Sequence, residues 1–536
     1  MPGRVRENGL ISSRVSALRS QPIISLTVSL CGFYVAWKTG HWISDGNFQE
    51  LIYSAVALVI CAIAVTIARN WRSGFYLFLV WLIFEDLVRK YLGNNMTIYF
   101  AKDALAGLTY ISLFLAVREG RAKVFRPQFL LFFSLFFWLG ALQIFNPYSP
   151  SILYGLLGMK IYFYYVPLIF VGYALIRDEG DLRRFLLVCV LLASVVSAVG
   201  VIQATGDSQF LNPANLAPEI SKLGNLLKVV PQTDQSFLLP SSVFVSTGRF
   251  AFFLVLAVIL GFGTAGYFVL ASLRGRLFIF LGISLIAIAV LLSGSRTAFL
   301  YSLISLFVLA AVFLWGAPWR RGQAHRLVKA IRRSCACAAV GLAILILLFP
   351  SAASSRYSFY SQTLLPSSST YELSSRAWSY PMQNLADTFS QPHWAVGNGI
   401  GTASLGIQYV SELTGKPQLN VWVEEGFGQL IVELGILGPI LWILWTAALL
   451  WTMWKAVRPL RESRLFPIAA AILWYAFIIL YPLTYLGLDV FQNFVNNAFL
   501  WLLVGILFRL RDLSLASPHL EGVGTGRSRT WRLLRA

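Results

Sequence analysis

Three arginines differ from the other charged residues because each lies among small or apolar neighbours. Arg249 lies in Ser-Thr-Gly-Arg-Phe (246–250), Arg296 lies in Ser-Gly-Ser-Arg-Thr (293–297), and Arg376 begins an amphipathic stretch of a long loop. A guanidinium can form two charge-assisted hydrogen bonds to phosphate oxygens. Charge within or beside an apolar span is costly and tends to be functional. These arginines therefore indicate a site for an anionic group such as a diphosphate.

Other charged residues are expected at the same membrane face. A carboxylate near an acceptor hydroxyl can remove its proton, and cations stabilise a diphosphate as it leaves. Aromatic residues, 15% of the chain, stack well on sugar rings. Together these groups predict glycosyl transfer from a polyprenyl-diphosphate sugar. The expected catalytic residues are Glu424 and Glu425, the expected diphosphate-binding residues are Arg249, Arg296, Arg376, Lys160 and Lys102, and Glu85, Asp86, Arg89, Lys90, Asp103 and Glu433 lie at the same face.

Each of these residues also has a purely structural alternative. Arg376 can pair with Glu372 one helical turn earlier. The two lysines can extend along apolar surface to reach the membrane interface. The two adjacent glutamates can cap the helix that follows them. Arg249 has no acidic residue near it in the sequence, so a local ion pair does not explain it.

The composition predicts the elements that must position these side chains. Of 536 residues, 57% are hydrophobic and only 12% charged, and the mean hydropathy is +0.69. A soluble domain has about 25% charged residues, so soluble enzymes, disordered chains and disulfide scaffolds are poor fits. A span needs roughly 20 apolar residues. Fourteen candidate spans are expected at 23–37, 51–68, 74–88, 97–117, 128–145, 154–176, 185–203, 242–271, 277–292, 297–316, 335–350, 428–453, 466–485 and 491–508.

The basic residues predict the orientation of these spans. With the N-terminus inside, eight segments face the cytoplasm and carry 31 Lys and Arg and 8 acidic residues, or +23. The remainder of the chain carries a net charge of −3, and the two parts together give the total of +20. This alternation follows the preference of cationic loops for the cytoplasmic side. It predicts a multi-pass protein with both termini cytoplasmic, and the charge offers no case for nucleic acid.

The expected fold is all-α, a polytopic membrane bundle of about 12–14 transmembrane helices with a large periplasmic loop domain. An uncleaved first helix is favoured over a signal peptide, since no small-x-small motif follows it. Cys335 and Cys337 have no nearby histidines, so neither a metal nor a cofactor is expected. The expected regions are a basic cytoplasmic N-terminus (1–22), N-terminal spans (23–240) with an outer loop (204–240), central spans (241–350), a periplasmic loop (351–425), C-terminal spans (426–509) and a disordered basic cytoplasmic tail (510–536).

Several short motifs resemble the family of O-antigen ligases and O-antigen polymerases. Leu-Ser-Gly-Ser-Arg-Thr-Ala (292–298) is similar to its Leu-Ser/Thr-x-Ser-Arg-x-Ala element. Ser-Arg-Ala-Trp (375–378) and Val-Gly-Asn-Gly-Ile-Gly-Thr (396–402) resemble its loop pattern, and Glu-Leu-Gly-Ile-Leu-Gly (433–438) resembles the start of its next span. The segment 246–250 matches an earlier arginine-bearing element, and the order of these elements is that of the family.

The resemblance implies a metal-independent glycosyltransferase at the periplasmic face of the bacterial inner membrane. Its donor would be an undecaprenyl-diphosphate-linked glycan, and its acceptor a polysaccharide or a lipid. Membrane lipids and other polysaccharide-assembly proteins would be its further partners. Arginines matching Arg249, Arg296 and Arg376 are expected to hold the diphosphate, and Lys102 and Lys160 match basic positions in some members.

The chain departs from the ligase pattern at one position. Ligases carry a His-Asn pair nine residues before the Glu of Glu-Leu-Gly, and here Glu424 and Glu425 stand there. A carboxylate can still act as base. The absence of the histidine argues against a lipid A-core ligase and favours a polymerase or ligase-like enzyme of O-antigen, capsule or exopolysaccharide synthesis. Two other classes stay open: a transporter or flippase for an anionic or lipid-linked substrate, and a noncatalytic scaffold. A transporter would show broken spans with polar groups near the bilayer midplane.

Overall fold

The computed structural model describes residues 37–38, 62–67, 70–93, 96–213, 227–233, 235–316, 321–368, 370–419, 421 and 423–516. The predicted segment 1–22, the predicted span 23–37 apart from residue 37, the predicted span 51–68 apart from residues 62–67, and the tail beyond residue 516 lie outside the described residues. The chain divides into two units, residues 1–74 and 75–536. In the first unit, the amide of Gly74 donates to the carbonyl of Asn70. All candidate site residues belong to the second unit.

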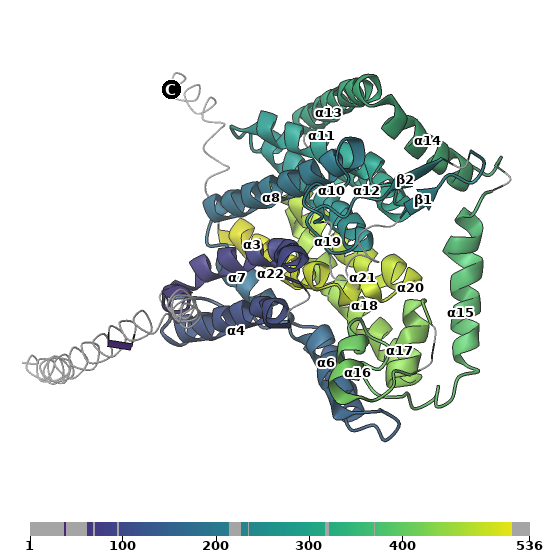
Figure 1. The fold of residues 1–536 in the computed structure, drawn as a ribbon. Helices are drawn as coiled ribbons and strands as arrows, with labels where there is room; N and C mark the ends of the chain where they lie inside the picture. The colour runs from purple at the N-terminus through teal and green to yellow at the C-terminus, as the bar shows by residue number, and fades with distance from the viewer. Residues whose placement is uncertain are drawn as a thin grey trace, which may run out of the picture. The chain divides into compact units, whose positions relative to one another are not determined.

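The described residues are almost entirely helical, with one two-stranded hairpin (Figure 1). The hairpin pairs β1 (Leu227–Val229) with β2 (Ser236–Leu238), with Lys228 opposite Phe237. The helices are α3 (Trp71–Leu92), α4 (Met96–Arg118), α5 (Leu130–Gln143), α6 (Ile152–Phe163), α7 (Leu168–Leu175), α8 (Glu179–Thr205), α10 (Thr247–Leu270), α11 (Arg276–Leu292), α12 (Arg296–Gly316), α13 (Arg321–Leu348), α14 (Pro350–Leu364), η1 (Ser375–Ser379), α15 (Tyr380–Thr388), α16 (Ile407–Thr414), α17 (Gly426–Leu434), α18 (Leu437–Val457), η2 (Arg458–Glu462), α19 (Phe466–Ile478), η3 (Ile479–Leu483), α20 (Thr484–Leu486), α21 (Asp489–Gln492) and α22 (Phe494–Ala516).

Eight helical segments within the described residues are long and apolar enough to cross a membrane. They are Thr97–Arg118, Ile152–Leu175, Glu179–Thr205, Thr247–Leu270, Arg296–Trp315, His325–Leu348, Leu437–Glu462 and Phe466–Leu486. Each overlaps a predicted span, and the protein is a multi-pass helical membrane protein. The predicted spans 128–145 and 277–292 form the shorter apolar helices α5 and α11. The predicted spans 74–88 and 491–508 lie in α3 and in α21 and α22.

Four of the predicted spans are interrupted, and one of them, 491–508, divides into α21 and α22 at Asn493. The span 154–176 divides into α6 and α7 around Pro167, whose ring cannot donate a backbone hydrogen bond. The span 428–453 divides into α17 and α18 at Gly435, which has a positive φ of 72°. The span 466–485 continues from α19 into the π-helical turn η3, which contains Pro482. A hydropathy window averages over such breaks, so the sequence analysis treated each span as one helix.

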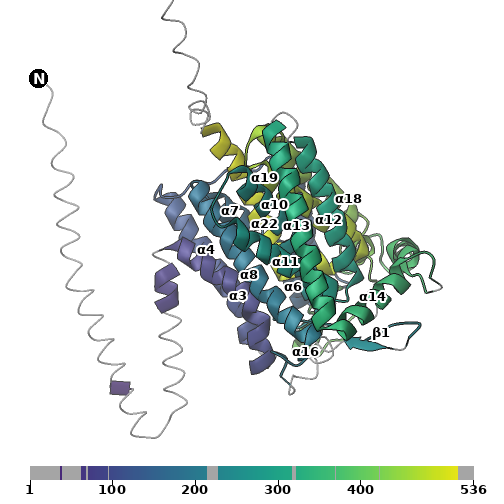
Figure 2. The same ribbon diagram turned by 90° about the horizontal axis from the view of Figure 1, so that it is seen from above.

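Helix α10 lies at the centre of the bundle. It packs against α8, α11, α12 and α19, and it is buried along almost its entire length. Figure 2 shows α8, α11 and α13 side by side, and α8 packs on α11 as α11 packs on α13. On the other side, α22 packs closely on α7. Arg249 therefore lies in the first turn of the central helix of the fold.

At one end of the bundle, α3 ends and α10 and α12 begin. The opposite end is identified by an ion pair and by a hydrogen bond from an arginine to a backbone carbonyl. Arg464 donates to the Glu179 carboxylate (Nη2 to Oε1, 2.7 Å), and Arg509 donates to the Ile176 carbonyl (Nε to O, 2.7 Å). The candidate site residues of α3, α10 and α12 thus lie at the end away from Glu179.

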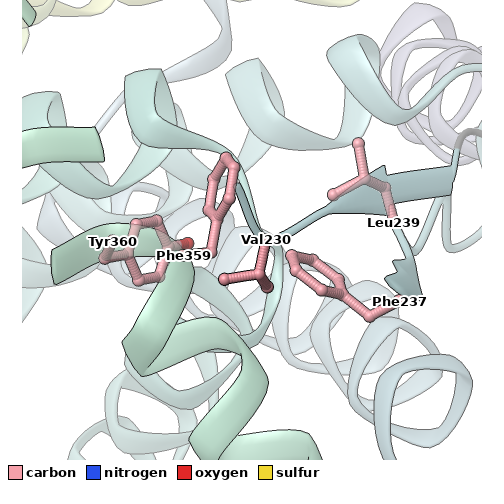
Figure 3. Packing of buried hydrophobic residues seen from close by; sticks show 5 residues of the cluster. All are labelled: Val230, Phe237, Leu239, Phe359 and Tyr360. Carbon is pink, nitrogen blue, oxygen red and sulfur yellow. The ribbon is translucent and has the colours of Figure 1, made fainter. Parts of the chain in front are cut away.

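The hairpin and α14 pack together at the candidate-site end (Figures 1 and 3). Their shared apolar core contains Val230, Phe237, Leu239, Phe359 and Tyr360. Gly294, in the turn before α12, has a φ of +66°, and a Cβ there would lie 2.6 Å from Leu239 and 2.7 Å from Phe237. The Ser-Gly-Ser-Arg turn therefore needs glycine both for its backbone conformation and for contact with the hairpin.

The predicted loop region 351–425 contains α14, η1, α15 and α16. Its glycine-rich segment 397–402 docks against the bundle, where a Cβ on Gly401 (φ +83°) would lie 2.7 Å from the Gly158 nitrogen in α6. The amide of Asn398 donates to the Val432 carbonyl (2.8 Å), and that of Gly399 donates to the Glu433 carbonyl (3.1 Å). The loop is thereby fixed to α6 and to the end of α17.

Candidate functional site

Seven charged residues from four helices form one connected group, here called the Arg249 cluster. Helix α3 contributes two adjacent residues and one a turn later, α4 contributes two consecutive residues, and α6 and α10 contribute one each. The cluster has one more cation than carboxylate. Its members are Glu85, Asp86, Arg89, Lys102, Asp103, Lys160 and Arg249.

Asp86 is the shared carboxylate of two arginines. Arg249 Nη1 lies 2.7 Å from Asp86 Oδ2 and 2.9 Å from Oδ1, and Arg89 Nη1 lies 3.2 Å from Oδ1. The backbone amide of Val245 also donates to Asp86 (3.3 Å). The Asp86 side chain is 1% exposed, whereas that of Arg249 is 22% exposed. Asp86 is therefore a buried support that holds the partly open guanidinium of Arg249 in place.

The two lysines of the cluster also have carboxylate partners. Lys102 Nζ lies 3.0 Å from Glu85 Oε2, and Lys160 Nζ lies 2.6 Å from Asp103 Oδ2. Lys102 is buried, so it does not extend to the interface as the structural alternative proposed. Arg249 has no acidic residue near it in the sequence, as noted above, and its carboxylate partner is Asp86, which lies 163 residues away.

Aromatic rings separate the cations of the cluster. Lys102 Nζ lies 3.4 Å from the centroid of the Tyr99 ring, and Lys160 Nζ lies 4.3 Å from the same centroid. The Arg249 guanidinium lies 4.8 Å from the centroid of Phe494. Such cation–π contacts are attractive, and they lower the cost of placing several cations close together.

A cavity of about 300 Å³ opens beside the cluster. Its walls combine the arginines with aromatic and amide side chains. It is lined by Arg89, Tyr99, Ile161, Val245, Ser246, Gly248, Arg249, Phe252, Leu405, Gly406, Gln408, Tyr409, Asp489, Gln492, Asn493 and Phe494.

Asp489 is a wall residue that the sequence analysis missed. Its side chain is open to solvent at the cavity, although protein surrounds it on most sides. The surrounding protein disfavours the charged form and so raises the pKa of Asp489 above its usual range. The nearby Glu424 raises this pKa further, and Arg249 lowers it. Asp489 thus brings a carboxyl group near both Arg249 and Glu424. A single acid beside the apolar start of a predicted span was the signal that could have found it.

Arg296 and Arg376 belong to a second group, here called the Arg296 cluster, with Glu372 and Lys228. Arg296 Nη1 lies 2.7 Å from Glu372 Oε2, and Arg376 Nε lies 3.9 Å from it. The hydrogen bond from Arg296 is the main cause of the lowered pKa of Glu372. Burial lowers the pKa of Lys228, and Arg296 lowers it further. This cluster has three cations and one carboxylate, and it is more exposed than the Arg249 cluster.

The two predicted catalytic glutamates differ in their surroundings. Glu425 is buried, and its carboxylate caps α17 by accepting from the amides of Phe427 (2.9 Å) and Gly428. Burial raises the pKa of Glu425 to about 7, although these two hydrogen bonds oppose the shift. Glu424 is exposed, and its amide donates to Asn384 Oδ1 (3.1 Å). The helix-capping alternative therefore describes Glu425, whereas the exposed Glu424 lies close enough to Asp489 to raise the pKa of that carboxyl group.

Glu433 links two of the motifs quoted above, its own Glu-Leu-Gly segment and the glycine-rich segment, whose Gly399 amide donates to the Glu433 carbonyl. Its Oε1 accepts from Ser404 Oγ (2.7 Å) and from the Ala403 amide (3.0 Å), while its Oε2 accepts from Tyr162 (2.9 Å). Gln492 donates to Ser404 Oγ (3.1 Å). The glycine-rich loop and the Glu-Leu-Gly segment thus meet in a buried polar network whose role is to fix the loop beside the cavity.

Within the described ranges, no group of three or more His, Cys, Asp or Glu side chains could hold a metal ion. Comparison with protein-family models, curated proteins and solved structures finds no match. The fold itself defines a multi-pass helical membrane protein with two cation-rich clusters at one end.

Proposed function

We propose that the protein is a membrane glycosyltransferase that polymerises or transfers a glycan carried on undecaprenyl diphosphate at the periplasmic face of the inner membrane. The observation that carries the proposal is the cavity beside the Arg249 cluster, whose lining combines Arg89 and Arg249 with the carboxyl group of Asp489. The resemblance of the motifs and their meeting around Glu433 add support. Function in O-antigen, capsule or exopolysaccharide synthesis rests on that resemblance.

The chemistry assigns separate tasks to the cations and the carboxylates. The acceptor hydroxyl oxygen attacks the anomeric carbon, and the bond from that carbon to the diphosphate oxygen breaks. The lipid diphosphate leaves with the bonding electrons, and Arg249, supported by Asp86, faces the charge that develops on it. The hydroxyl proton passes to a carboxylate, for which exposed Glu424 beside Asp489 is the proposed base.

The test uses purified full-length protein in lipid nanodiscs with a polyprenyl-diphosphate-linked oligosaccharide. Product chains are separated by size, so that chain growth and transfer to a second acceptor give different patterns. Removing one donor to a developing anion typically lowers kcat by about 10²–10³. Arg249→Gln should therefore lose at least about a hundredfold, whereas Arg121→Gln, an exposed arginine paired with Glu119, should stay active. Unchanged product formation by Arg249→Gln would refute the proposal.

A second comparison addresses the base. Glu424→Gln should lower the rate of glycan transfer and keep donor binding, because it removes a proton acceptor and leaves the cations in place. Glu412→Gln, an exposed residue of α16, is the matched control. Equal rates in the two variants would exclude Glu424 as the base.

Transport of a lipid-linked anion is the second candidate, and the interrupted helices favour it. Helices break at Pro167, Gly435 and Asn493, and the last break follows the buried amide of Gln492, which resembles the discontinuous helices of transporters. The same nanodisc preparation yields no product in that case. Proteoliposomes with a fluorescent polyprenyl-diphosphate lipid would then show protein-dependent movement between leaflets, and a glycosyltransferase would not.

A further inference from the structure

An apolar cavity lies at the end of the bundle opposite the candidate site. It has a volume of about 390 Å³ and lies between α12, α18, η2 and α19. Its walls are aliphatic and aromatic apart from two guanidinium groups. It is lined by Val308, Leu309, Val312, Trp315, Leu450, Trp454, Val457, Arg458, Arg461, Phe466, Ala470, Leu473, Trp474 and Phe477.

The two arginines lie on the same side of a single turn. Arg458 and Arg461 are three residues apart in the 3₁₀ turn η2, a spacing at which side chains align along the turn. The Arg461 guanidinium lies 3.6 Å from the centroid of the Trp315 ring. Its Nε is buried without a hydrogen-bond partner among the described residues. Within this part of the chain, neither guanidinium forms an ion pair with a carboxylate.

A nearby arginine shows the contrast. Arg464, only three residues beyond Arg461, pairs with Glu179 at 2.7 Å. Arg458 and Arg461 thus line an apolar cavity without a carboxylate partner among the described residues. A bound carboxylate or phosphate could pair with them. Tryptophan rings such as Trp315 and Trp454 are typical of the level at which lipid headgroups lie.

We propose that this cavity, here called the Arg461 groove, binds an anionic glycerophospholipid. The acyl chain lies along the apolar wall formed by α12, α18 and α19, and the phosphate accepts hydrogen bonds from Arg458 and Arg461. Arginine suits this role because its guanidinium presents several donors to phosphate oxygens while stacking on an aromatic ring. The site is independent of the glycosyl-transfer proposal, because it lies at the other end of the bundle.

The experiment measures lipid retained by the full-length protein in a neutral detergent, using native mass spectrometry. The probes are phosphatidylglycerol and phosphatidylcholine with identical acyl chains, added at equal concentration. The protein should retain phosphatidylglycerol in clear preference. Arg458→Gln with Arg461→Gln should lower that preference by about thirtyfold, or about fivefold for either change alone, from the usual contribution of one basic residue near an anionic lipid surface.

Two further variants separate this groove from general surface charge. Arg464→Gln removes the same charge nearby from an arginine that already has a carboxylate partner, and it should keep the preference. Leu473→Trp keeps all charges and fills the groove, and it should release the lipid. Equal retention of both lipids, an unchanged preference in the double arginine variant or in Leu473→Trp, or an equal loss in Arg464→Gln would each overturn the proposal.

Discussion

Replacing Asp86 with asparagine removes the one carboxylate that supports both Arg89 and Arg249. The change keeps the size of the side chain and one oxygen acceptor, but it removes the negative charge between two guanidinium groups. Breaking a buried ion pair by removing one partner costs about 3–5 kcal/mol. Arg249 is 22% exposed and Arg89 still lies 3.8 Å from Glu85, so we expect a loss near the lower value, about 3 kcal/mol.

The matched control is Glu119→Gln, which breaks the pair with Arg121. Both of those side chains are more than half exposed, and such surface pairs contribute about 0–1 kcal/mol. Denaturant-induced unfolding in mixed micelles, monitored by tryptophan fluorescence, compares the two variants at one pH and salt concentration. If Asp86→Asn and Glu119→Gln unfold at the same denaturant concentration, the argument that Asp86 is a buried support for the cluster is wrong.

Three further predictions concern stability. Glu425 has a pKa of about 7 in the folded protein against 4.5 in the unfolded chain, so the folded protein binds this proton more tightly. The free energy of unfolding, relative to that of Glu425→Gln, should therefore fall by roughly 3 kcal/mol between pH 4.5 and 7. Unfolding at several pH values measures this difference. Gly294→Ala should cost about 1–3 kcal/mol more than Gly275→Ala, whose φ is also positive but whose Cβ would meet nothing within 4 Å, and equal unfolding midpoints would contradict this. Tyr162→Phe should cost about 1.5–3 kcal/mol of unfolding free energy, because it removes a hydrogen bond to the Glu433 carboxylate. The buried hydroxyl of Tyr485 has no hydrogen-bond partner among the described residues, so Tyr485→Phe should be neutral or slightly stabilising in the same assay.

Local patterns in the sequence predicted the helices and the end at which the charged residues gather. Hydropathy located the spans because the bilayer requires long apolar helices. It did not locate the breaks at Pro167 and Gly435, since a window of about 20 residues averages over a single turn. The residues that cause those breaks were nevertheless visible in the sequence.

Pairing across the bundle was not predictable from one sequence. Asp86 and Arg249 are 163 residues apart, and only the packing of α3 beside the start of α10 brings them together. The same holds for Lys160 and Asp103, which lie on neighbouring helices. The three arginines predicted to hold one diphosphate are divided between the Arg249 and Arg296 clusters, because Glu372 draws Arg296 toward Arg376.

The segment that carries Arg376 is anchored at both ends and has few buried side chains in between. On one side, α14 is fixed by the apolar core of the hairpin, and on the other, the loop 397–402 is fixed to α6 and α17. Between them, η1 has no buried residue, and α15 buries only Pro381 and Thr388. We therefore expect amide hydrogen exchange to be fast across η1 and α15 and slow in both flanking anchors. Helix α15 is tied to α17, because Asn384 Oδ1 accepts from the Glu424 amide, so a movement of η1 and Arg376 would pivot about this contact and leave the core intact.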